Sequence, residues 1–366
     1  MSLIKHIYIS IPFCNNFCRF CNFFKLPPAQ WLPFTRSSKL AGLLQKEMLL
    51  YKKILPQNPV SIYTGGGTPA LSGKNNLKTL TAFLKEQFCL TNTETTIEAN
   101  PVCKNLENIP DSFFNRISIG IQSFSPQALH KLGRKIRPER AFLKNAAASY
   151  KNISVDLIYN IPGTGPEVIK NDLLKCLHYN VKHLSCYTLE GFKNDNKYFK
   201  TEYNTILTIL KKNNIKQYEI SNYAAPGFEC RHNLGYWQYN YFLGIGPGAC
   251  GSIPYPRSSD GVIRYRNYRD INKYQNAVNN GRVPCAKCKV LTRSEQFNEY
   301  VLTGLRTVNG ISTAYIKQKY SIDFMKEFKN HLDKFRDSLC IKGDKIKLLK
   351  NGFLYYNSIV SNFMKI

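Results

Sequence analysis

The sequence of 366 residues lacks a long apolar run and is poor in acidic side chains. No stretch approaches the roughly 18 consecutive apolar residues of a membrane-spanning helix, so no membrane span is expected. Only 24 Asp and Glu residues accompany 51 Lys and Arg residues, which gives a formal net charge of +27. This surplus suits an anionic partner. It is not gathered into a basic arm or a recognisable nucleic-acid-binding module, so we expect a lysine-rich solvated surface and no nucleic-acid partner.

A secretion signal and a disulfide framework are also not expected, although the chain contains 12 cysteines. The first ten residues, MSLIKHIYIS, have no small-residue cleavage site and too short an apolar run. Cysteine-rich disulfide scaffolds are typical of small secreted domains rather than of chains of this length. We therefore expect a cytoplasmic protein in a reducing compartment, with most cysteines acting as small buried apolar side chains.

The first half of the chain alternates between β-rich segments and helical patterns. Strands are expected at residues 6–11, 60–63, 95–101, 116–124, 153–163 and 183–189, and helical patterns at 37–54, 139–150 and 167–177. Alternation of this kind predicts parallel βαβ units.

Chemically distinctive residues follow the carboxyl ends of these strands. They are Cys14, the glycine turn at 65–69, Glu98, Gln122 and Asp156. In a parallel sheet or barrel the loops at that edge converge, and ligands bind there. The sequence therefore predicts one site at the carboxyl edge of the sheet.

The pattern changes after about residue 190. We expect residues 1–190 to form the main domain and residues 191–290 a connecting region. Residues 291–366 contain three helical segments, the stretch SLCIKGDKIKLL with a turn at Gly343 and Asp344, and a last helix. This order predicts a helical, winged-helix-like C-terminal domain with a β-hairpin as its wing.

Three cysteines lie close together in IPFCNNFCRFCNFF. Cys14, Cys18 and Cys21 have the spacing C-x3-C-x2-C. Thiolates hold iron–sulfur clusters, usually four of them, so three would leave one iron open to another ligand. Structural zinc usually takes four protein ligands and would need a distant fourth here, so zinc is the weaker interpretation. The interleaved phenylalanines at 13, 17, 20 and 23 would shield a cluster from water, or would simply fill the core.

The stretch TGGGTP at 64–69 is a glycine-rich turn after a strand. Glycines allow a backbone to approach a ligand closely. The turn lacks the lysine of a nucleotide-binding phosphate loop, so an amino-acid-like ligand fits better. Glu98 and Asp156 offer carboxylates to an amine or a ribose hydroxyl, although for each residue alone a helix cap or a surface position is the better interpretation.

Together these stretches resemble radical S-adenosylmethionine (SAM) proteins. More narrowly, the sequence is similar to the group that contains oxygen-independent coproporphyrinogen III dehydrogenase and the HemW-type heme chaperones. The resemblance covers nearly the whole chain and rests on IYISIPFCNNFCRFCNFF, YTGGGTP, IEANP, RISIGIQSFSPQALHKLGR, VDLIYNIPG, YEISNYAAPGFECRHNLGYW, LGIGPGACG and LLKNGFLYYNSIVSNFM. It implies an α/β fold, a partial (β/α)6 radical SAM barrel with a C-terminal accessory domain.

The resemblance also implies cofactors and the residues that hold them. A [4Fe-4S] cluster is implied on Cys14, Cys18 and Cys21, with its open iron bound by the amino and carboxylate groups of SAM. By position, the implied SAM-binding residues are Tyr8, Phe20, Gly66, Gly67, Thr68, Glu98, Gln122, Arg134 and Asp156.

Three features separate the two branches of this group. The dehydrogenases typically have a longer extension before the first cysteine, and a further cysteine where Phe23 stands here. The stretch HNLGYW matches the HNxxYW motif of the chaperones, with His232, Asn233, Tyr236 and Trp237 as heme-binding candidates. The resemblance favours a chaperone that carries heme to acceptor proteins. The alternative is the dehydrogenase, which decarboxylates coproporphyrinogen III, so enzymatic activity stays an open question at this point.

Histidine is a common axial ligand of heme iron, and aromatic rings can line a macrocycle pocket. Equally, His232 could cap a turn and Trp237 could fill the core. The resembled proteins usually have a histidine at the position of Ser10, and often one at the position of Cys250. These two departures leave open whether radical chemistry is fully retained. The extra pair Cys285 and Cys288 lies outside the family pattern and is interpreted as incidental. A dimer is a further expectation.

Overall fold

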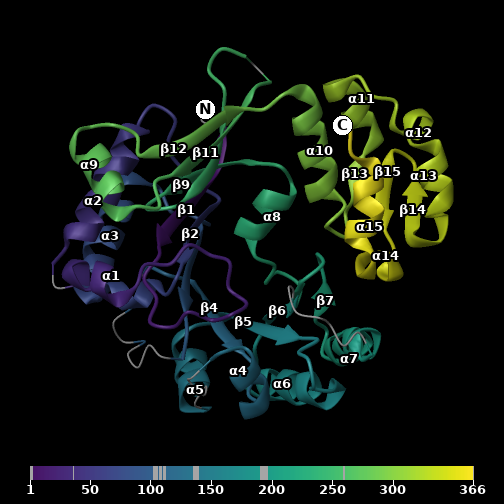
Figure 1. The fold of residues 1–366 in the computed structure, drawn as a ribbon, viewed down its shortest axis with the longest axis horizontal. Helices are drawn as coiled ribbons and strands as arrows, with labels where there is room; N and C mark the ends of the chain where they lie inside the picture. The colour runs from purple at the N-terminus through teal and green to yellow at the C-terminus, as the bar shows by residue number, and fades with distance from the viewer. Residues whose placement is uncertain are drawn as a thin grey trace.

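The computed structural model describes residues 3–35, 37–101, 106, 109, 113–134, 140–189, 197–258 and 260–365. These residues form a twelve-stranded sheet with helices packed against it and a smaller domain beside it (Figure 1). The strand order of the large sheet is β12-β11-β10-β9-β1-β2-β3-β4-β5-β6-β8-β7, and a second sheet has the order β13-β15-β14. The predicted α/β class is confirmed.

The six strands predicted in the first half lie side by side in chain order. They are β1 (Ile4–Ile11), β2 (Ser61–Gly66), β3 (Glu94–Ala99), β4 (Arg116–Gln122), β5 (Asn152–Tyr159) and β6 (His183–Thr188). Each neighbouring pair is parallel, as the alternation of strands and helices predicts. The carboxyl ends of all six strands therefore meet at one edge of the sheet.

Helices connect these strands and cover the sheet. They are α1 (Pro28–Thr35), α2 (Lys39–Leu50), the 3-10 turn η1 (Pro69–Ser72), α3 (Lys74–Gln87), α4 (Pro126–Lys131), α5 (Arg140–Ser149), α6 (Pro166–His178) and α7 (Phe199–Lys212). In α2 the apolar side chains recur at helical spacing, and Leu40, Leu44 and Met48 are fully buried. Helix α4 begins at Pro126, because the Ser125 side chain caps it by accepting a hydrogen bond from the Ala128 N–H.

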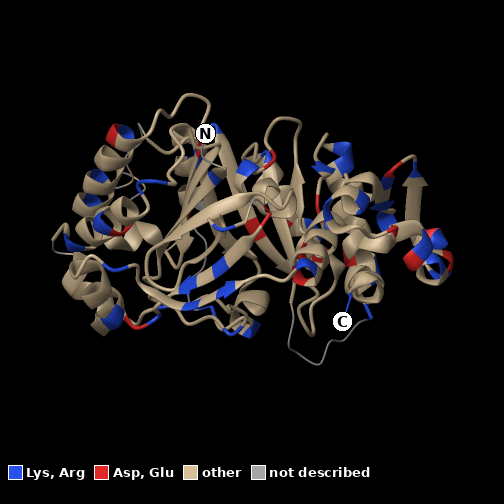
Figure 2. Cartoon of the chain, turned by 90° about the horizontal axis from the view of Figure 1, so that it is seen from above, with Lys and Arg blue, Asp and Glu red and all other residues tan. Residues whose placement is uncertain are grey.

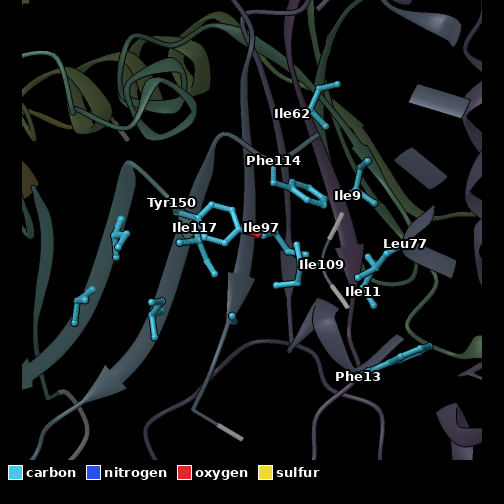
Figure 3. Packing of buried hydrophobic residues seen from close by; sticks show 14 of the residues in the cluster. Ile9, Ile11, Phe13, Ile62, Leu77, Ile97, Ile109, Phe114, Ile117 and Tyr150 are labelled. Atoms are coloured by element: carbon cyan, nitrogen blue, oxygen red, sulfur yellow. The ribbon is translucent and has the colours of Figure 1, made fainter. Parts of the chain in front are cut away.

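The main core lies between the parallel strands and the helices (Figure 3). Ile9, Ile62, Ile97 and Ile117 come from four neighbouring strands, and all are fully buried. Leu77 of α3 packs against this layer from the helix side. Strands that are buried in this way read as nearly continuous apolar runs, which is why the sequence reveals them.

Both edges of the large sheet are built by segments that the sequence analysis did not assign as strands. β9 (Tyr241–Ile245) follows α8 (Arg231–Trp237) and pairs in parallel with β1, which adds a seventh parallel strand. β10 (Cys250–Pro254), β11 (Val262–Asn267) and β12 (Cys285–Val290) continue the sheet antiparallel, with α9 (Ile271–Asn279) between the last two. β8 (Asn222–Ala224) and β7 (Lys216–Gln217) form the opposite edge.

The C-terminal region has helices, then the hairpin, then helices, as predicted, but four α-helices rather than three precede the hairpin and two rather than one follow it. Its elements are α10 (Arg293–Gly304), β13 (Ile311–Ser312), α11 (Thr313–Tyr320), α12 (Phe324–Glu327), α13 (Lys329–Lys334), η3 (Arg336–Ser338), β14 (Leu339–Lys342), β15 (Lys345–Leu348), α14 (Lys350–Leu354), α15 (Tyr356–Val360) and η4 (Ser361–Phe363). The hairpin turns at Gly343, whose φ is +59°. A separate apolar cluster around Phe297 and Phe363 forms the core of this region.

Two surface properties bear on the expected partners. Lys and Arg residues are distributed over the helices, the sheet and the C-terminal region rather than gathered in one segment (Figure 2). Among the described residues, no helix combines the length and the apolar character needed to cross a membrane.

Candidate functional site

A cavity of about 1140 Å³ opens at the carboxyl ends of the parallel strands. Its wall combines the cysteine loop (residues 12–25), the glycine turn, the strand ends and part of the C-terminal domain. All three cysteines and all but one of the SAM-binding candidates line it, namely Cys14, Cys18, Cys21, Phe20, Gly66, Gly67, Thr68, Glu98, Gln122, Arg134 and Asp156. The fold therefore brings together residues that are spread over more than 140 positions of the sequence.

The cysteine loop carries its three thiols to one wall of this cavity. Cys14 is 9% exposed, whereas Cys18 and Cys21 are half-buried. The Cys14 thiol donates to the backbone oxygen of Asn16 at 2.9 Å, and the Asn16 side-chain amide donates to the Cys18 sulfur at 3.4 Å. The Cys21 N–H donates to the Cys18 carbonyl at 3.2 Å, which closes a tight turn. The loop thus holds three thiols within a short, folded segment.

Positive charges lie beside these thiols. Burial raises the pKa of the Cys18 thiol, while the Arg134 guanidinium and the Lys25 ammonium lower it. Lys25 also donates to the Cys21 carbonyl at 3.0 Å. In the described part of the chain, no group of three His, Cys, Asp or Glu side chains is placed to hold a single metal ion. Three thiols beside cations are a donor set that fits an iron–sulfur cluster, which carries negative charge and spreads its cysteine ligands over separate irons.

The glycine turn is held against Glu98. The Gly66 N–H donates to Glu98 Oε2 at 3.0 Å, and the Tyr63 hydroxyl donates to Glu98 Oε1 at 2.9 Å. A Cβ atom at Gly65 would lie 2.7 Å from the Glu98 carboxyl carbon, and Gly66 has a φ of +104°. The close approach and the positive φ explain why glycines occupy these positions.

The same turn is tied to the cysteine loop. The Thr68 N–H donates to the Phe13 carbonyl at 2.7 Å, and the Asn100 side chain donates to Thr68 Oγ1 at 2.7 Å. A Cβ atom at Gly67 would lie 2.5 Å from the Phe13 carbonyl oxygen. The cysteine loop and the glycine turn are therefore one packed unit.

Two half-buried carboxyl groups face the cavity. Burial raises the pKa of Glu98 to about 7, and the nearby Asp156 contributes to this rise. Burial also raises the pKa of Asp156, against hydrogen bonds from Ser185 and Ser118 and the charge of Arg116. Because both groups are costly to ionise in this environment, each is suited to accept a hydrogen bond from a cationic or hydroxyl-bearing ligand.

The end of β4 carries a local distortion. Gln122 has a φ of +70°, which is rare for a residue with a side chain, and the β4–β5 register shifts between Gly120 and Gln122. Arg134 donates to the Gly120 carbonyl at 2.6 Å. Strain and irregular pairing of this kind are often found at functional sites. Gln122 and Arg134, which were both predicted to bind SAM, therefore lie together at this bulge.

Tyr8 is the one SAM-binding candidate that does not line the cavity. Its hydroxyl lies 3.3 Å from the position a Cβ atom at Gly66 would take, and its ring stacks on Tyr63 with centroids 6.1 Å apart. Tyr8 therefore supports the glycine turn from below. Its direct contact with SAM stays a prediction.

The HNxxYW motif forms helix α8, and its histidine is buried. His232 is 1% exposed, its N–H donates to Glu94 at 3.1 Å, and burial lowers its pKa well below the usual range. Its Nδ1 lies 2.7 Å from Ser61 Oγ, and its Nε2 lies 2.7 Å from the Tyr236 hydroxyl. Both ring nitrogens therefore have hydrogen-bond partners within the protein.

The other motif residues take different positions. Asn233 lines the cavity. The Tyr236 ring packs edge-on against the Phe242 ring, with centroids 4.5 Å apart. The Arg306 guanidinium lies over the Trp237 ring, 4.5 Å from its centroid. The motif thus packs α8 between the sheet and the C-terminal domain, and heme binding by its residues stays a prediction.

Comparisons with known proteins identify the family. Residues 8–175 match the model of the radical SAM superfamily. The heme chaperone HemW of Buchnera aphidicola subsp. Schizaphis graminum is 30% identical over 98% of both chains. The heme chaperone HemW of Lactococcus lactis subsp. lactis is 28% identical over 98% of this chain and 96% of its own.

The chain belongs to the HemW family of radical SAM proteins. Among solved structures, coproporphyrinogen III oxidase (HemN) of Escherichia coli, a radical SAM enzyme, has a TM-score of 0.77 and covers 99% of this chain and 90% of its own. At 18% identity this likeness shows the shared fold. The partial barrel with a C-terminal domain is thereby confirmed.

The C-terminal domain of this HemW-family chain contributes residues that the sequence analysis did not include in the site. Arg306 and the helical segment from Phe353 to Ser358 line the cavity. Arg306 Nε forms an ion pair with Glu219 Oε2 at 2.7 Å, and Glu219 is fully buried. The stretch LLKNGFLYYNSIVSNFM was the sequence signal for these residues. It showed similarity to the family, but it did not show that this segment lies at the cavity.

The four phenylalanines of the HemW-family cysteine loop take different positions. Phe13 is fully buried and stacks on Trp31 with centroids 5.3 Å apart, so it belongs to the core. Phe17 and Phe23 are 54% and 68% exposed, and Phe23 is among the residues that line the cavity. Phe20 packs against the apolar cluster that includes Ala128 of α4, and it also lines the cavity. Shielding of a cluster by these rings stays a prediction.

Ser10 and Cys250, the two residues that depart from the family pattern, lie at different positions in the structure. The Ser10 hydroxyl donates to the Pro247 carbonyl at 2.8 Å, which ties the end of β1 to the segment before β10. Cys250 is exposed on β10, outside the lining of the cavity.

Proposed function

We propose that this protein is a cytoplasmic heme chaperone of the HemW type, which binds a [4Fe-4S] cluster, SAM and heme and passes heme to acceptor proteins. The observation that carries the cofactor part is the shared cavity. Three thiols, a glycine turn and a half-buried carboxylate face the same space, and these groups match the chemistry of a cluster and of an amino-acid-like ligand.

Within this proposal, Cys14, Cys18 and Cys21 would hold the cluster. A bound cluster would supply one iron that is open to the methionine end of SAM. Glu98 would accept hydrogen bonds from the amine of SAM, and Asp156 from a ribose hydroxyl. Arg134, beside Cys18, would offset the negative charge of the thiolates.

Anaerobic reconstitution tests the cofactor part. Cys18→Ser is expected to lose the iron, the sulfide and the visible absorption of the reconstituted protein. Cys89→Ser is the matched control, because Cys89 is exposed and lies outside the cavity lining. Equal iron and sulfide contents in Cys18→Ser and the wild type would refute cluster binding at this loop.

The heme part rests on family membership and on charge. The relatives at 28–30% identity are named heme chaperones, and the net charge of +27 suits an anionic porphyrin. Asn233, Tyr236 and Trp237 remain heme-binding candidates. For His232 we propose a positioning role, because its Nε2 is bonded to the Tyr236 hydroxyl.

Two assays run side by side distinguish chaperone from enzyme. The reconstituted protein is titrated with hemin and, separately, assayed for decarboxylation of coproporphyrinogen III. The proposal expects saturable hemin binding, transfer of the bound heme to an acceptor apoprotein and no decarboxylation above the background without protein. Robust decarboxylation would overturn the proposal in favour of the dehydrogenase.

A further inference from the structure

The outer strands of the large sheet carry a row of cations on one face. Cys250 on β10 is paired with Arg266 on β11, and Arg266 is paired with Lys287 on β12. Arg264 is paired in the same way with Lys289. Directly opposed residues of antiparallel strands point to the same face, with Cβ atoms about 5 Å apart. Four cations and one thiol therefore share this face of β10–β12.

Helix α10 neutralises one half of the row. The Arg264 guanidinium donates to Glu299 Oε2 from Nη2 at 2.6 Å and from Nε at 3.1 Å. Lys289 forms an ion pair with Glu295, one turn earlier in the same helix. The two acidic side chains of α10 thus compensate the two cations beneath it.

The other half of the row has no such compensation. In the part of the chain that the structure describes, Arg266, Lys287 and also Arg269, two residues after β11, have no acidic partner within ion-pair distance. The Nε of Arg266 is buried and has no hydrogen-bond partner among the described residues. Arg269, Lys287 and Cys250 are exposed. We call the four residues Cys250, Arg266, Arg269 and Lys287 the open half.

An aromatic ring of the cysteine loop borders the open half. The Arg269 guanidinium lies 5.8 Å from the ring of Phe24, which belongs to the cysteine loop. In the neutralised half, the Arg264 guanidinium lies 5.5 Å from the Phe242 ring, and Phe242 contacts Tyr236 of the HNxxYW helix. The whole row of cations therefore extends from the cysteine loop, beside the open half, to the helix that carries the heme-binding candidates, beside the neutralised half.

We propose that the open half binds heme, with the Cys250 sulfur on the iron and Arg266, Arg269 and Lys287 paired with the propionates. Guanidinium and ammonium groups bind carboxylates with charge-assisted hydrogen bonds, and a cysteine thiolate is one of the axial ligands that proteins use for heme. As the sulfur–iron bond forms, the thiol releases its proton to solvent. Cys250 offers an exposed sulfur, whereas both ring nitrogens of His232 are already bonded.

This inference rests on the proposed function and assigns it a site. It explains why the cations form a cluster that α10 covers only in part. It also places the iron ligand outside the SAM cavity, so that heme and SAM can be bound at the same time.

Hemin titration of the reconstituted full chain tests the iron ligand. Wild-type protein is expected to show the absorption and electron paramagnetic resonance spectra of thiolate-ligated ferric heme. Cys250→Ser is expected to lose these spectra and to bind hemin about tenfold more weakly, and Cys250→His to give histidine-type spectra. Cys288→Ser is the matched control, because Cys288 is also exposed but follows Lys287 and points to the opposite face.

Metal-free protoporphyrin IX tests the propionate contacts separately. Lys287→Gln, an exposed substitution, and Arg266→Gln are each expected to weaken binding of both porphyrins about tenfold. Cys250→Ser is expected to leave metal-free binding unchanged. If Cys250→Ser and Lys287→Gln both keep the wild-type hemin affinity and spectrum, this inference is overturned while the proposed function stands. If the wild type binds no hemin, the proposed function itself fails.

Discussion

The backbone N–H of Gly66 donates a hydrogen bond to Glu98 at 3.0 Å, so the glycine turn and the carboxylate predicted for the methionine end of SAM are in direct contact. The Tyr63 hydroxyl occupies the other carboxylate oxygen. The carboxylate is thus oriented before any ligand arrives. Orientation of this kind reduces the entropy that binding costs.

The raised pKa of Glu98 makes SAM binding dependent on pH. Below its pKa of about 7, Glu98 is protonated and accepts the SAM amine poorly. We expect the affinity for SAM to fall by about tenfold per pH unit below 7 and to be constant above it. Calorimetric titration of the reconstituted protein at several pH values measures this. Glu98→Gln should bind weakly with no such slope, and an unchanged slope in this variant would assign the titration to another group.

Glycine is required at position 67 by the nearby backbone. A Cβ atom there would lie 2.5 Å from the Phe13 carbonyl oxygen, which side-chain rotation cannot relieve. We expect Gly67→Ala to lower the free energy of unfolding by roughly 1–3 kcal/mol and to reduce the iron content after reconstitution. Denaturant unfolding and iron analysis measure the two effects.

The control for this substitution lies in α2. A Cβ atom at Gly42 meets nothing within 4 Å, so Gly42→Ala is expected to stabilise the helix by about 0.5–1 kcal/mol with unchanged iron content. Wild-type stability and iron content in Gly67→Ala would contradict the packing of the glycine turn against the cysteine loop.

His232 links three elements, so its loss should reduce stability. Replacement by Ala leaves a cavity and removes partners from Ser61 and Tyr236. We expect His232→Ala to lower the free energy of unfolding by about 2–4 kcal/mol. His178→Ala, at an exposed position on α6, should change it by no more than about 0.5 kcal/mol. A fully stable His232→Ala protein that has lost hemin binding would instead show a direct role in the heme site.

Much of the fold and of the cavity could be predicted from local patterns. The apolar runs of β1–β6 and the dense cysteine and glycine motifs place Cys14, Gly66 and Glu98 at one sheet edge, and the structure brings them together. In contrast, β9 is five residues long, and its pairing with β1 depends on contacts across more than 200 positions of sequence. No periodicity encodes such a contact.

The exposure of Phe17 and Phe23 was not predictable for a related reason. Loop residues follow no regular alternation, so the sequence does not show which aromatic side chains of the cysteine loop point inward. The contribution of Arg306 and the residues around Tyr355 to the cavity is likewise a matter of how the C-terminal domain docks, which neither hydrophobic pattern nor spacing reports.

The docking of that domain depends on Arg306. Its Nε is 2.7 Å from Glu219 Oε2, its guanidinium stacks on Trp237 at 4.5 Å, and Glu219 is fully buried. Removing the cation leaves a buried carboxylate without its charge partner, which is more costly than losing an exposed ion pair. We therefore expect Arg306→Met to lower the free energy of unfolding by about 3–5 kcal/mol and to speed proteolysis between the sheet and α10.

A double substitution separates the cost of the unpaired charge from the loss of packing. Arg306→Met combined with Glu219→Gln removes both charges, so it should recover part of the lost free energy of unfolding. Lys170→Met, which removes an exposed ion pair with Glu167, should cost less than about 1 kcal/mol. If Arg306→Met were no more destabilising than Lys170→Met, the ion pair with Glu219 would not hold the C-terminal domain over the cavity, and Trp237 and the backbone contacts would have to do so.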